Sequence, residues 1–266
     1  MSFLGKVIAF HSYKGGTGKS FLSLNVAVNL ALQGEKVALL DYDFRAPTLF
    51  HRFQPVNVES CSLNEYLDCR IPFEKVLFDY SHFLASKGTL MLGFASPKTR
   101  DMQEMQIKSR QWQQRALTLL MQAISKLKPQ FDWIILDSSP GVTYDSLNAM
   151  STSEAVVLVS TLDHADLQGT GEMCLEIWPS LMKFGAKPSL VLNKVPRVGL
   201  GSQDKLYDTT DLEKEFFEEN GVEIILKIPI FCDHSLLTKS IFIREFSDHP
   251  LSKYVQDLGQ ILMNGR

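Results

Sequence analysis

The sequence lacks the cysteine pattern of a disulfide scaffold or a metal centre. Its four cysteines, Cys61, Cys69, Cys174 and Cys232, are scattered, and no two of them form a CxxC pair. This spacing argues against a secreted disulfide framework and against a zinc or iron–sulfur site built by one chain. We therefore expect four reduced thiols, most of them buried.

Long apolar runs and an excess of positive charge are also missing. No apolar run approaches the ~20 residues that cross a bilayer. The first ten residues do not have the long apolar core and cleavage site of a signal peptide, so we expect a soluble cytoplasmic protein. With 27 Lys+Arg against 30 Asp+Glu, the net charge is −3. A global basic surface for nucleic acid is thus excluded, whereas a local basic patch is not.

Repeats and low-complexity linkers are absent, and short apolar segments instead alternate with helical patterns. This organisation favours a single domain over residues 1–266. The expected strands are 6–10, 36–40, 89–94, 133–136, 155–160, 189–192 and 222–228. The expected helices are 19–33, 110–127, 166–184, 208–220 and 250–263, and segments 52–61 and 195–207 have the composition of loops. Several strands are continuously apolar, which predicts an α/β fold: a doubly wound, mostly parallel sheet with helices on both faces.

A glycine-rich segment follows the first expected strand and precedes the first expected helix. It reads His11-Ser12-Tyr13-Lys14-Gly15-Gly16-Thr17-Gly18-Lys19-Ser20. In this order, backbone N–H groups and the helix N-terminus form a cradle for phosphate. Lys19 is expected to reach the β- and γ-phosphates, and the Ser20 hydroxyl to bind Mg²⁺. The pattern predicts a P-loop NTPase, although Tyr13 replaces the usual first glycine and Lys14 adds a second lysine.

Residues 14–20, KGGTGKS, resemble the deviant Walker A motif, xKGGxxK[ST], of the MinD/ParA family of ATPases. Further segments are similar to that family in the same order along the chain. They are the acidic pair in 41–43, the Walker B-like strand and switch loop in 133–141, residues 95–101, Asn193-Lys194 and Ile228-Pro229. The resemblance implies an ATPase with ATP and Mg²⁺ as cofactors, homodimerisation on ATP binding, and slow turnover that a partner stimulates.

The resemblance also assigns the nucleotide contacts. It places Gly15, Gly16, Thr17, Gly18, Lys19, Ser20 and Phe21 around the nucleotide, and Asn193, Lys194 and Pro229 around its base. An Asn193 amide offers both a donor and an acceptor to adenine, and Lys194 can lay its alkyl stem along the base. The alternative for Asn193 is an ordinary turn residue after a strand.

Three aspartates end expected strands. Asp137 closes an apolar strand, where a carboxylate faces the ligand crevice of a parallel sheet. Asp41 and Asp43 are two residues apart and point the same way if the chain is extended. Such close carboxylates repel unless a cation separates them. The resemblance makes Ser20, Asp41 and Asp137 metal-site residues, and gives Asp43 the role of positioning or deprotonating the attacking water. The alternatives are a turn cap for Asp137 and a solvated acidic turn for the pair.

Lys14 needs a role different from that of Lys19. The resemblance implies that Lys14 crosses a homodimer interface and contacts the partner's nucleotide, where it stabilises transition-state charge as an arginine finger does. With Lys14, Lys19 and Asp43 as catalytic residues, dimerisation and hydrolysis would be coupled. The alternative is a surface lysine that attracts phosphate generically.

The cellular role is less specified than the chemistry. We expect a MinD-like switch that positions a cellular complex through protein partners. DNA binding of the ParA type is the first alternative, through a patch of Arg197, Lys205, Lys239, Arg244 and Lys253. Membrane association through the last helix is less expected, because only Lys253 and Arg266 in that stretch are basic. The six histidines are interpreted as structural or surface residues, and segment 102–114 as an exposed helix.

Overall fold

The computed structural model describes residues 4–55, 61–84, 87–199, 205–232 and 241–265. Its main sheet contains β1 (Lys6–His11), β2 (Lys36–Tyr42), β3 (Leu77–Asp79), β4 (Thr89–Gly93), β5 (Trp133–Ser138), β6 (Ala155–Ser160), β7 (Lys187–Val195) and β10 (Ile224–Pro229). The strand order is β10-β7-β6-β1-β5-β2-β4-β3. All neighbours are parallel except the β3–β4 pair at one edge, which is antiparallel. The predicted doubly wound, mostly parallel α/β fold is confirmed.

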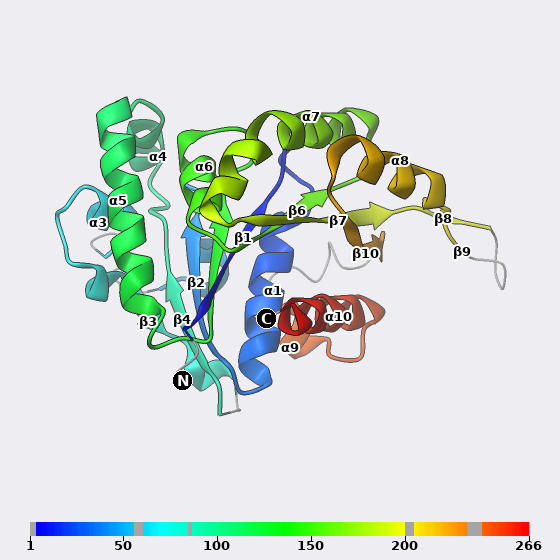
Figure 1. Cartoon of the computed structure of the whole chain (residues 1–266). Helices are drawn as coiled ribbons and strands as arrows, with labels where there is room; N and C mark the ends of the chain where they lie inside the picture. Colours follow the sequence, from blue (N-terminus) through cyan, green and yellow to red (C-terminus); the bar gives the residue numbers. More distant parts are fainter. Residues whose placement is uncertain (1–3, 56–60, 85–86, 200–204, 233–240, 266) are drawn as a thin grey trace.

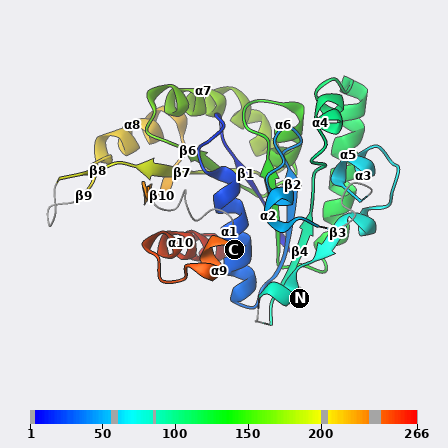
Figure 2. The same cartoon turned by 180° about the vertical axis from the view of Figure 1, so that it is seen from behind.

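Helices cover both faces of this sheet (Figures 1 and 2). They are α1 (Lys19–Leu32), α2 (Leu49–Phe53), α3 (Leu63–Leu67), α4 (Thr99–Gln106), α5 (Arg110–Leu127), α6 (Tyr144–Ser151), α7 (His164–Leu181), α8 (Thr210–Asn220), α9 (Phe242–Glu245) and α10 (Pro250–Asn264). Short 3₁₀ turns are η2 (Phe73–Val76), η3 (Ser81–Phe83) and η4 (Met182–Phe184), and β8 (Arg197–Val198) pairs with β9 (Lys205–Leu206).

Two hydrophobic cores lie on opposite faces of the sheet, and β1 contributes to both. Val7 and Ala9 pack on the side of α5, α6 and α7, whereas Ile8 and Phe10 pack on the side of α1, α9 and α10. Alternate side chains of a strand point to opposite faces, so a strand covered on both sides must be apolar throughout. The central position of β1 places the glycine-rich loop at the middle of the sheet's carboxyl edge.

Several boundaries differ from expectation for local reasons. Segment 102–114 is two helices: α4 ends at Gln106, and α5 begins after Ser109, whose hydroxyl accepts from the Trp112 amide at 3.2 Å. The sequence analysis missed α6, a short helix whose N-terminus is fixed by a capping box between Thr143 and Ser146. It also missed the edge strand β3, which is three residues long.

The expected loops are only partly seen. Segment 195–207 contains the β8–β9 pair, and its residues 200–204 lie outside the described residues, as do 56–60 of segment 52–61. The described helices include none with the length and apolar character that a bilayer crossing requires. The expectation of mostly buried thiols is wrong: Cys174 is buried, but Cys69 and Cys232 are exposed and Cys61 is intermediate. Cys69 sits in a surface turn at φ 60°, directly after α3.

Candidate functional site

The glycine-rich loop has the backbone conformation that only glycine adopts readily. Gly16 and Gly18 have φ values of 83° and 98°, in the left-handed region. A Cβ on Gly18 would lie 2.3 Å from Asn193 Nδ2, so the side chain is excluded there by contact as well. By contrast, no described atom lies within 4 Å of a Cβ built on Gly15 or Gly16. That side of the loop is open to an anion, and the first amides of α1 follow at once.

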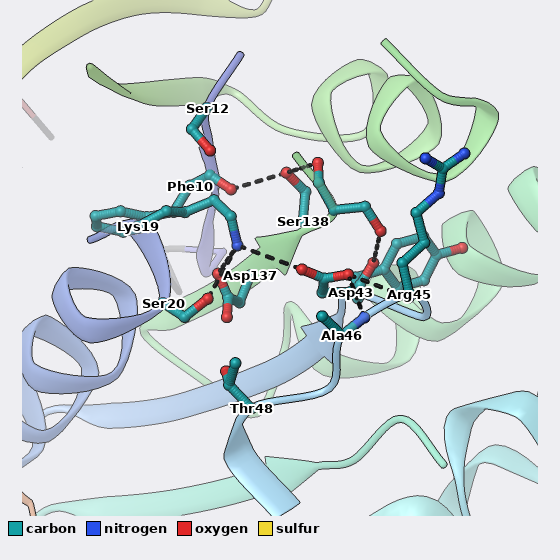
Figure 3. A network of polar contacts seen from close by, with 12 residues as sticks. Phe10, Ser12, Lys19, Ser20, Asp43, Arg45, Ala46, Thr48, Asp137 and Ser138 are labelled. Carbon is teal, nitrogen blue, oxygen red and sulfur yellow. Dashed lines mark hydrogen bonds and ion pairs between the residues drawn. The ribbon is translucent and has the colours of Figure 1, made fainter. Parts of the chain in front are cut away.

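Lys19 is the buried cation of the site (Figure 3). Its side chain is 6% exposed, and Nζ donates to Asp137 Oδ1 at 2.7 Å and to Ser20 Oγ at 3.0 Å. Asp43 Oδ2 lies 4.0 Å from the same nitrogen. The parallel register pairs Asp41 of β2 with Asp137 of β5, which brings the carboxyl ends of both strands to this lysine. One ammonium therefore faces several carboxylates.

Three buried carboxylates gather near Lys19, and the charge of Arg52 also acts on Asp137. Asp41 and Asp137 are fully buried, and Asp43 is 4% exposed. Burial, followed by the charges of Asp137 and Asp43, raises the pKa of Asp41 well above its ordinary value. Asp137 Oδ2 is buried and has no hydrogen-bond partner among the described residues. Among the described residues no three acidic, histidine or cysteine side chains are grouped so that they could hold a metal ion by themselves, so a hard cation such as Mg²⁺ would need oxygen ligands from outside the chain as well.

Backbone amides fix the two aspartates of the 41–43 segment. Asp41 Oδ2 accepts from the amides of Thr48 and Leu49 at 3.1 Å, so this residue shapes the loop that follows β2. Asp43 Oδ1 accepts from the amides of Arg45 and Ala46, also at 3.1 Å. Asp43 Oδ2 is then the oxygen that faces Lys19. Asp41 and Asp43 therefore both lie at the site. The amides of the loop after β2 hold Asp41 Oδ2, whereas Asp43 Oδ2 faces Lys19.

A buried histidine links the loop to β5. His11 Nδ1 and Ser138 Oγ are 2.9 Å apart, and the Ser138 hydroxyl donates to the Phe10 carbonyl at 2.9 Å. Because that hydroxyl proton is used, the His11 Nδ1–H must donate to Ser138. Burial first, and Lys19 second, lower the pKa of His11 to about 3, so the ring is neutral. The sequence analysis missed this pair. The pair joins two neighbouring strands, in which Phe10 and Asp137 are in register and His11 and Ser138 follow them, so no spacing along the sequence reveals it.

Lys14 lies on the outer flank of the loop. Its Nζ donates to Asp163 Oδ1 at 2.7 Å within the same chain, and the two side chains are 43% and 61% exposed. The hydrogen bond with Asp163 raises the pKa of Lys14. Asp163 is also the N-cap of α7. The ring of Tyr13 packs against the same helix, where a Cβ on Gly169 would lie 2.1 Å from Tyr13 Cε1. Neither Asp163 nor Gly169 was found from the sequence.

The residues expected near the base lie beside the loop. Asn193 Nδ2 donates to the Thr17 carbonyl at 2.7 Å, and Lys194 Nζ donates to the Gly16 carbonyl at 2.5 Å. Pro229 is buried at the end of β10. The Phe21 ring packs edge-on against Phe242 at 5.5 Å in the core, so its backbone is the part nearest the loop. Asn193 and Lys194 of β7 therefore hydrogen-bond to the glycine loop. The role of each residue in binding a base stays a prediction.

Comparison with known proteins places this site in context. A family model described as AAA domain matches residues 5–183. The sporulation initiation inhibitor protein Soj of Bacillus subtilis is 26% identical over 172 residues, 64% of this chain and 64% of Soj. The septum site-determining protein MinD of Thermotoga maritima is 29% identical over 158 residues, 59% of this chain and 53% of MinD. The matched part thus spans less than two thirds of either relative.

A solved structure is similar over nearly the whole chain. MinD of Pyrococcus horikoshii, in complex with Mg-ADP, superposes with a TM-score of 0.72. The superposition covers 97% of this chain and 96% of that one at 18% identity, and at this identity it shows the fold.

Proposed function

The chain belongs to the AAA domain family whose model covers residues 5–183, as a P-loop ATPase of the MinD/ParA type, and from this premise we propose that it is an ATP-dependent molecular switch. In this proposal the single domain binds ATP with Mg²⁺, dimerises, and hydrolyses ATP slowly until a protein partner stimulates it. The switch positions a cellular complex in the cytoplasm. The similar P. horikoshii MinD holds Mg-ADP, which supports the choice of nucleotide and metal.

The observation that carries the proposal is the charge arrangement around Lys19. The lysine begins α1 directly after the open glycine loop, and it neutralises a fully buried Asp137. When Nζ turns to a phosphate, Asp137 loses the ammonium that pairs with it, and its second oxygen has no described hydrogen-bond partner. A divalent cation bound by Ser20 and near Asp137 would supply the missing charge and neutralise the phosphates. Asp41 would support that cation while it holds the loop after β2.

Asp43 is proposed to act on the attacking water. Two backbone amides hold its Oδ1, which leaves Oδ2 at the side of the site that faces Lys19. A carboxylate held in this way can orient a water and accept its proton. Lys14 would act in trans. Since its ion pair with Asp163 is exposed and therefore weak, Lys14 can exchange Asp163 for a nucleotide on a second copy of the chain.

The client is proposed to be a protein rather than DNA or lipid. The DNA alternative needs Arg197, Lys205, Lys239, Arg244 and Lys253 on one patch, and the net charge of −3 disfavours it. Lys239 lies outside the described residues. In the membrane alternative, α10 would present an apolar stripe, but that stripe is buried in the core beside α1 (Figure 1).

Calorimetry with ATP and ADP, with and without Mg²⁺, tests the nucleotide assignment. We expect Lys19→Ala to lose at least about 100-fold in ATP affinity, because it removes the buried ammonium that meets the phosphates. Lys187→Ala, an exposed lysine at the start of β7, is the matched control. Wild-type affinity in Lys19→Ala would overturn the phosphate assignment.

Light scattering with ATP tests the switch itself. Lys14→Ala should bind ATP normally and remain a monomer, whereas Asp43→Ala should retain ATP and form a lasting dimer with turnover reduced by about 10²-fold or more. Pull-downs with Asp43→Ala, run in parallel against cell protein, DNA and liposomes, separate the three clients. Retention by DNA or liposomes alone would replace the proposed protein client.

A further inference from the structure

Negative charge is concentrated on α7 and α8. Together these helices carry eight acidic residues and one basic residue, Lys214, whereas the whole chain has a net charge of −3. The rest of the molecule is therefore net positive. Two of the eight have partners elsewhere in the fold: Asp166 is buried and accepts from Thr161, and Glu213 accepts from Lys227. The other six are exposed, and two of them, Glu172 and Glu218, have a side-chain partner within their own helix.

An apolar groove runs between these two helices, which lie side by side in both views (Figures 1 and 2). It encloses about 410 Å³ and is lined by the apolar side chains of Leu162, Leu167, Leu175, Leu212 and Phe216. Leu175 is 57% exposed, a large fraction for a leucine beside a cavity. The two helices come close to each other at Gly171, where an added Cβ would lie 2.9 Å from Asn220 Oδ1.

The groove is bordered by carboxylates. Glu172 projects from α7, and Glu215 and Glu219 project from α8, while the described lining residues include one histidine, His164, and neither lysine nor arginine. Gln168 donates to Glu172 at 2.9 Å, which leaves the carboxylate charge in place. An apolar floor between acidic edges selects a partner with an apolar stripe between basic edges.

We infer that this groove, named here the α7–α8 groove, docks a basic amphipathic helix of a partner protein. The partner's apolar i, i+3, i+4 and i+7 residues enter the floor, and its lysines or arginines pair with Glu172, Glu215 and Glu219. Nucleic acid and anionic lipid are disfavoured because their phosphates would face these carboxylates. A second copy of this chain is disfavoured as well, since two such acidic faces repel each other.

The probe is a synthetic 14-residue amphipathic helix with a leucine stripe flanked by lysines, and its control has glutamates in place of the lysines. Fluorescence anisotropy at low salt measures binding, and hydrogen exchange locates it. We expect micromolar binding of the lysine peptide, protection of amides in α7 and α8, and at least about tenfold weaker binding of the glutamate peptide. No binding of the lysine peptide, or protection elsewhere, overturns the inference.

Charge-reversed variants separate the groove from the net charge of the protein. Glu172→Lys with Glu219→Lys should weaken binding of the lysine peptide at least about tenfold. Asp248→Lys with Asp257→Lys makes the same charge change at exposed positions before and on α10, and should leave binding within about twofold. Equal losses in the two variants overturn the inference. The peptide is titrated into the wild-type protein without nucleotide, so its binding does not depend on the proposed nucleotide site, and either proposal can fail without the other.

Discussion

Two lysines of one short loop occupy opposite environments. Lys19 is 6% exposed and faces Asp137 and Asp43 in the floor of the site, whereas Lys14 is 43% exposed and pairs with Asp163 on the flank. A buried charge that loses its partner is costly, while an exposed pair contributes little and is screened by salt. The floor is therefore a fixed part of the fold, and the flank is the part whose partners can change.

The largest expected effect tests the floor without any nucleotide. Lys19→Met should lower the free energy of unfolding by about 3–5 kcal/mol, because it leaves Asp137 buried without its cation. Urea unfolding at pH 7 measures this loss. Lys14→Met is the matched control on the flank, and we expect no measurable change there. Equal losses in both variants would mean that the two environments do not differ as described.

The pH dependence of stability tests two buried groups next to the floor: His11, on which the charge of Lys19 acts, and Asp145 of α6, on which the charge of Asp43 acts. The pKa of His11 is lowered to about 3 by burial, so the unfolded chain takes up a proton below pH 6.5 that the folded chain refuses. The contribution of His11 to the free energy of unfolding is complete above pH 6.5 and is lost as the pH falls. Burial raises the pKa of Asp145 to about 6, so the folded chain keeps a proton that the unfolded chain releases above about pH 4. Its contribution is lost as the pH rises toward 6.

Between pH 4 and 6, a rise in pH therefore increases the contribution of His11 to the free energy of unfolding and decreases that of Asp145. Asp145→Asn should raise the free energy of unfolding at pH 7 by about 2–3 kcal/mol, since a shift of one unit corresponds to about 1.4 kcal/mol. The variant should also lose stability more steeply than the wild-type protein as the pH falls from 6 to 4. Urea titrations at several pH values give both quantities, and parallel profiles for the two proteins would contradict the assignment.

The smallest expected effect probes the flank. In Gly169→Ala the new Cβ would meet the Tyr13 ring, which lies 2.1 Å from its position. We expect a loss of about 1 kcal/mol, since alanine's better helix propensity offsets part of the displaced packing. In a Tyr13→Ala background the same substitution should instead stabilise the protein by a similar amount. The same sign of effect in both backgrounds would show that the ring does not pack on α7.

The local motifs were predictable, and the contacts across the fold were not. Spacing predicted Lys19 and Ser20, because strand, loop and helix are contiguous in sequence, and the resemblance added the acidic 41–43 segment. The structure brings Asp43 within 4.0 Å of Lys19, and the roles of these residues stay predictions. The alternation of apolar runs gave the sheet and placed α5 at its observed limits. The ion pair of Lys14 with Asp163 joins residues that are 149 positions apart, so only the tertiary fold reveals it.

Short or surface-dependent features were missed for a related reason. The break between α4 and α5 depends on one serine that acts as an N-cap, and such residues also occur inside helices and loops. The exposed Cys69 contradicts a general preference of thiols for the interior, because its position follows a surface turn. The α7–α8 groove needs two helices side by side, and neither helix alone shows more than an acidic face.

The bond between Asn193 and the glycine loop bears on purine selection. Its amide nitrogen already donates to the Thr17 carbonyl, which fixes the orientation of the group. One N–H of the amide is left over beside the oxygen, and a purine that lies on the oxygen side of Asn193 would meet an acceptor that suits the 6-amino group of adenine and repels the 6-oxo group of guanine or hypoxanthine. Binding of ITP as tight as that of ATP would exclude this contact. The loop that cradles the triphosphate would then also set which base is accepted.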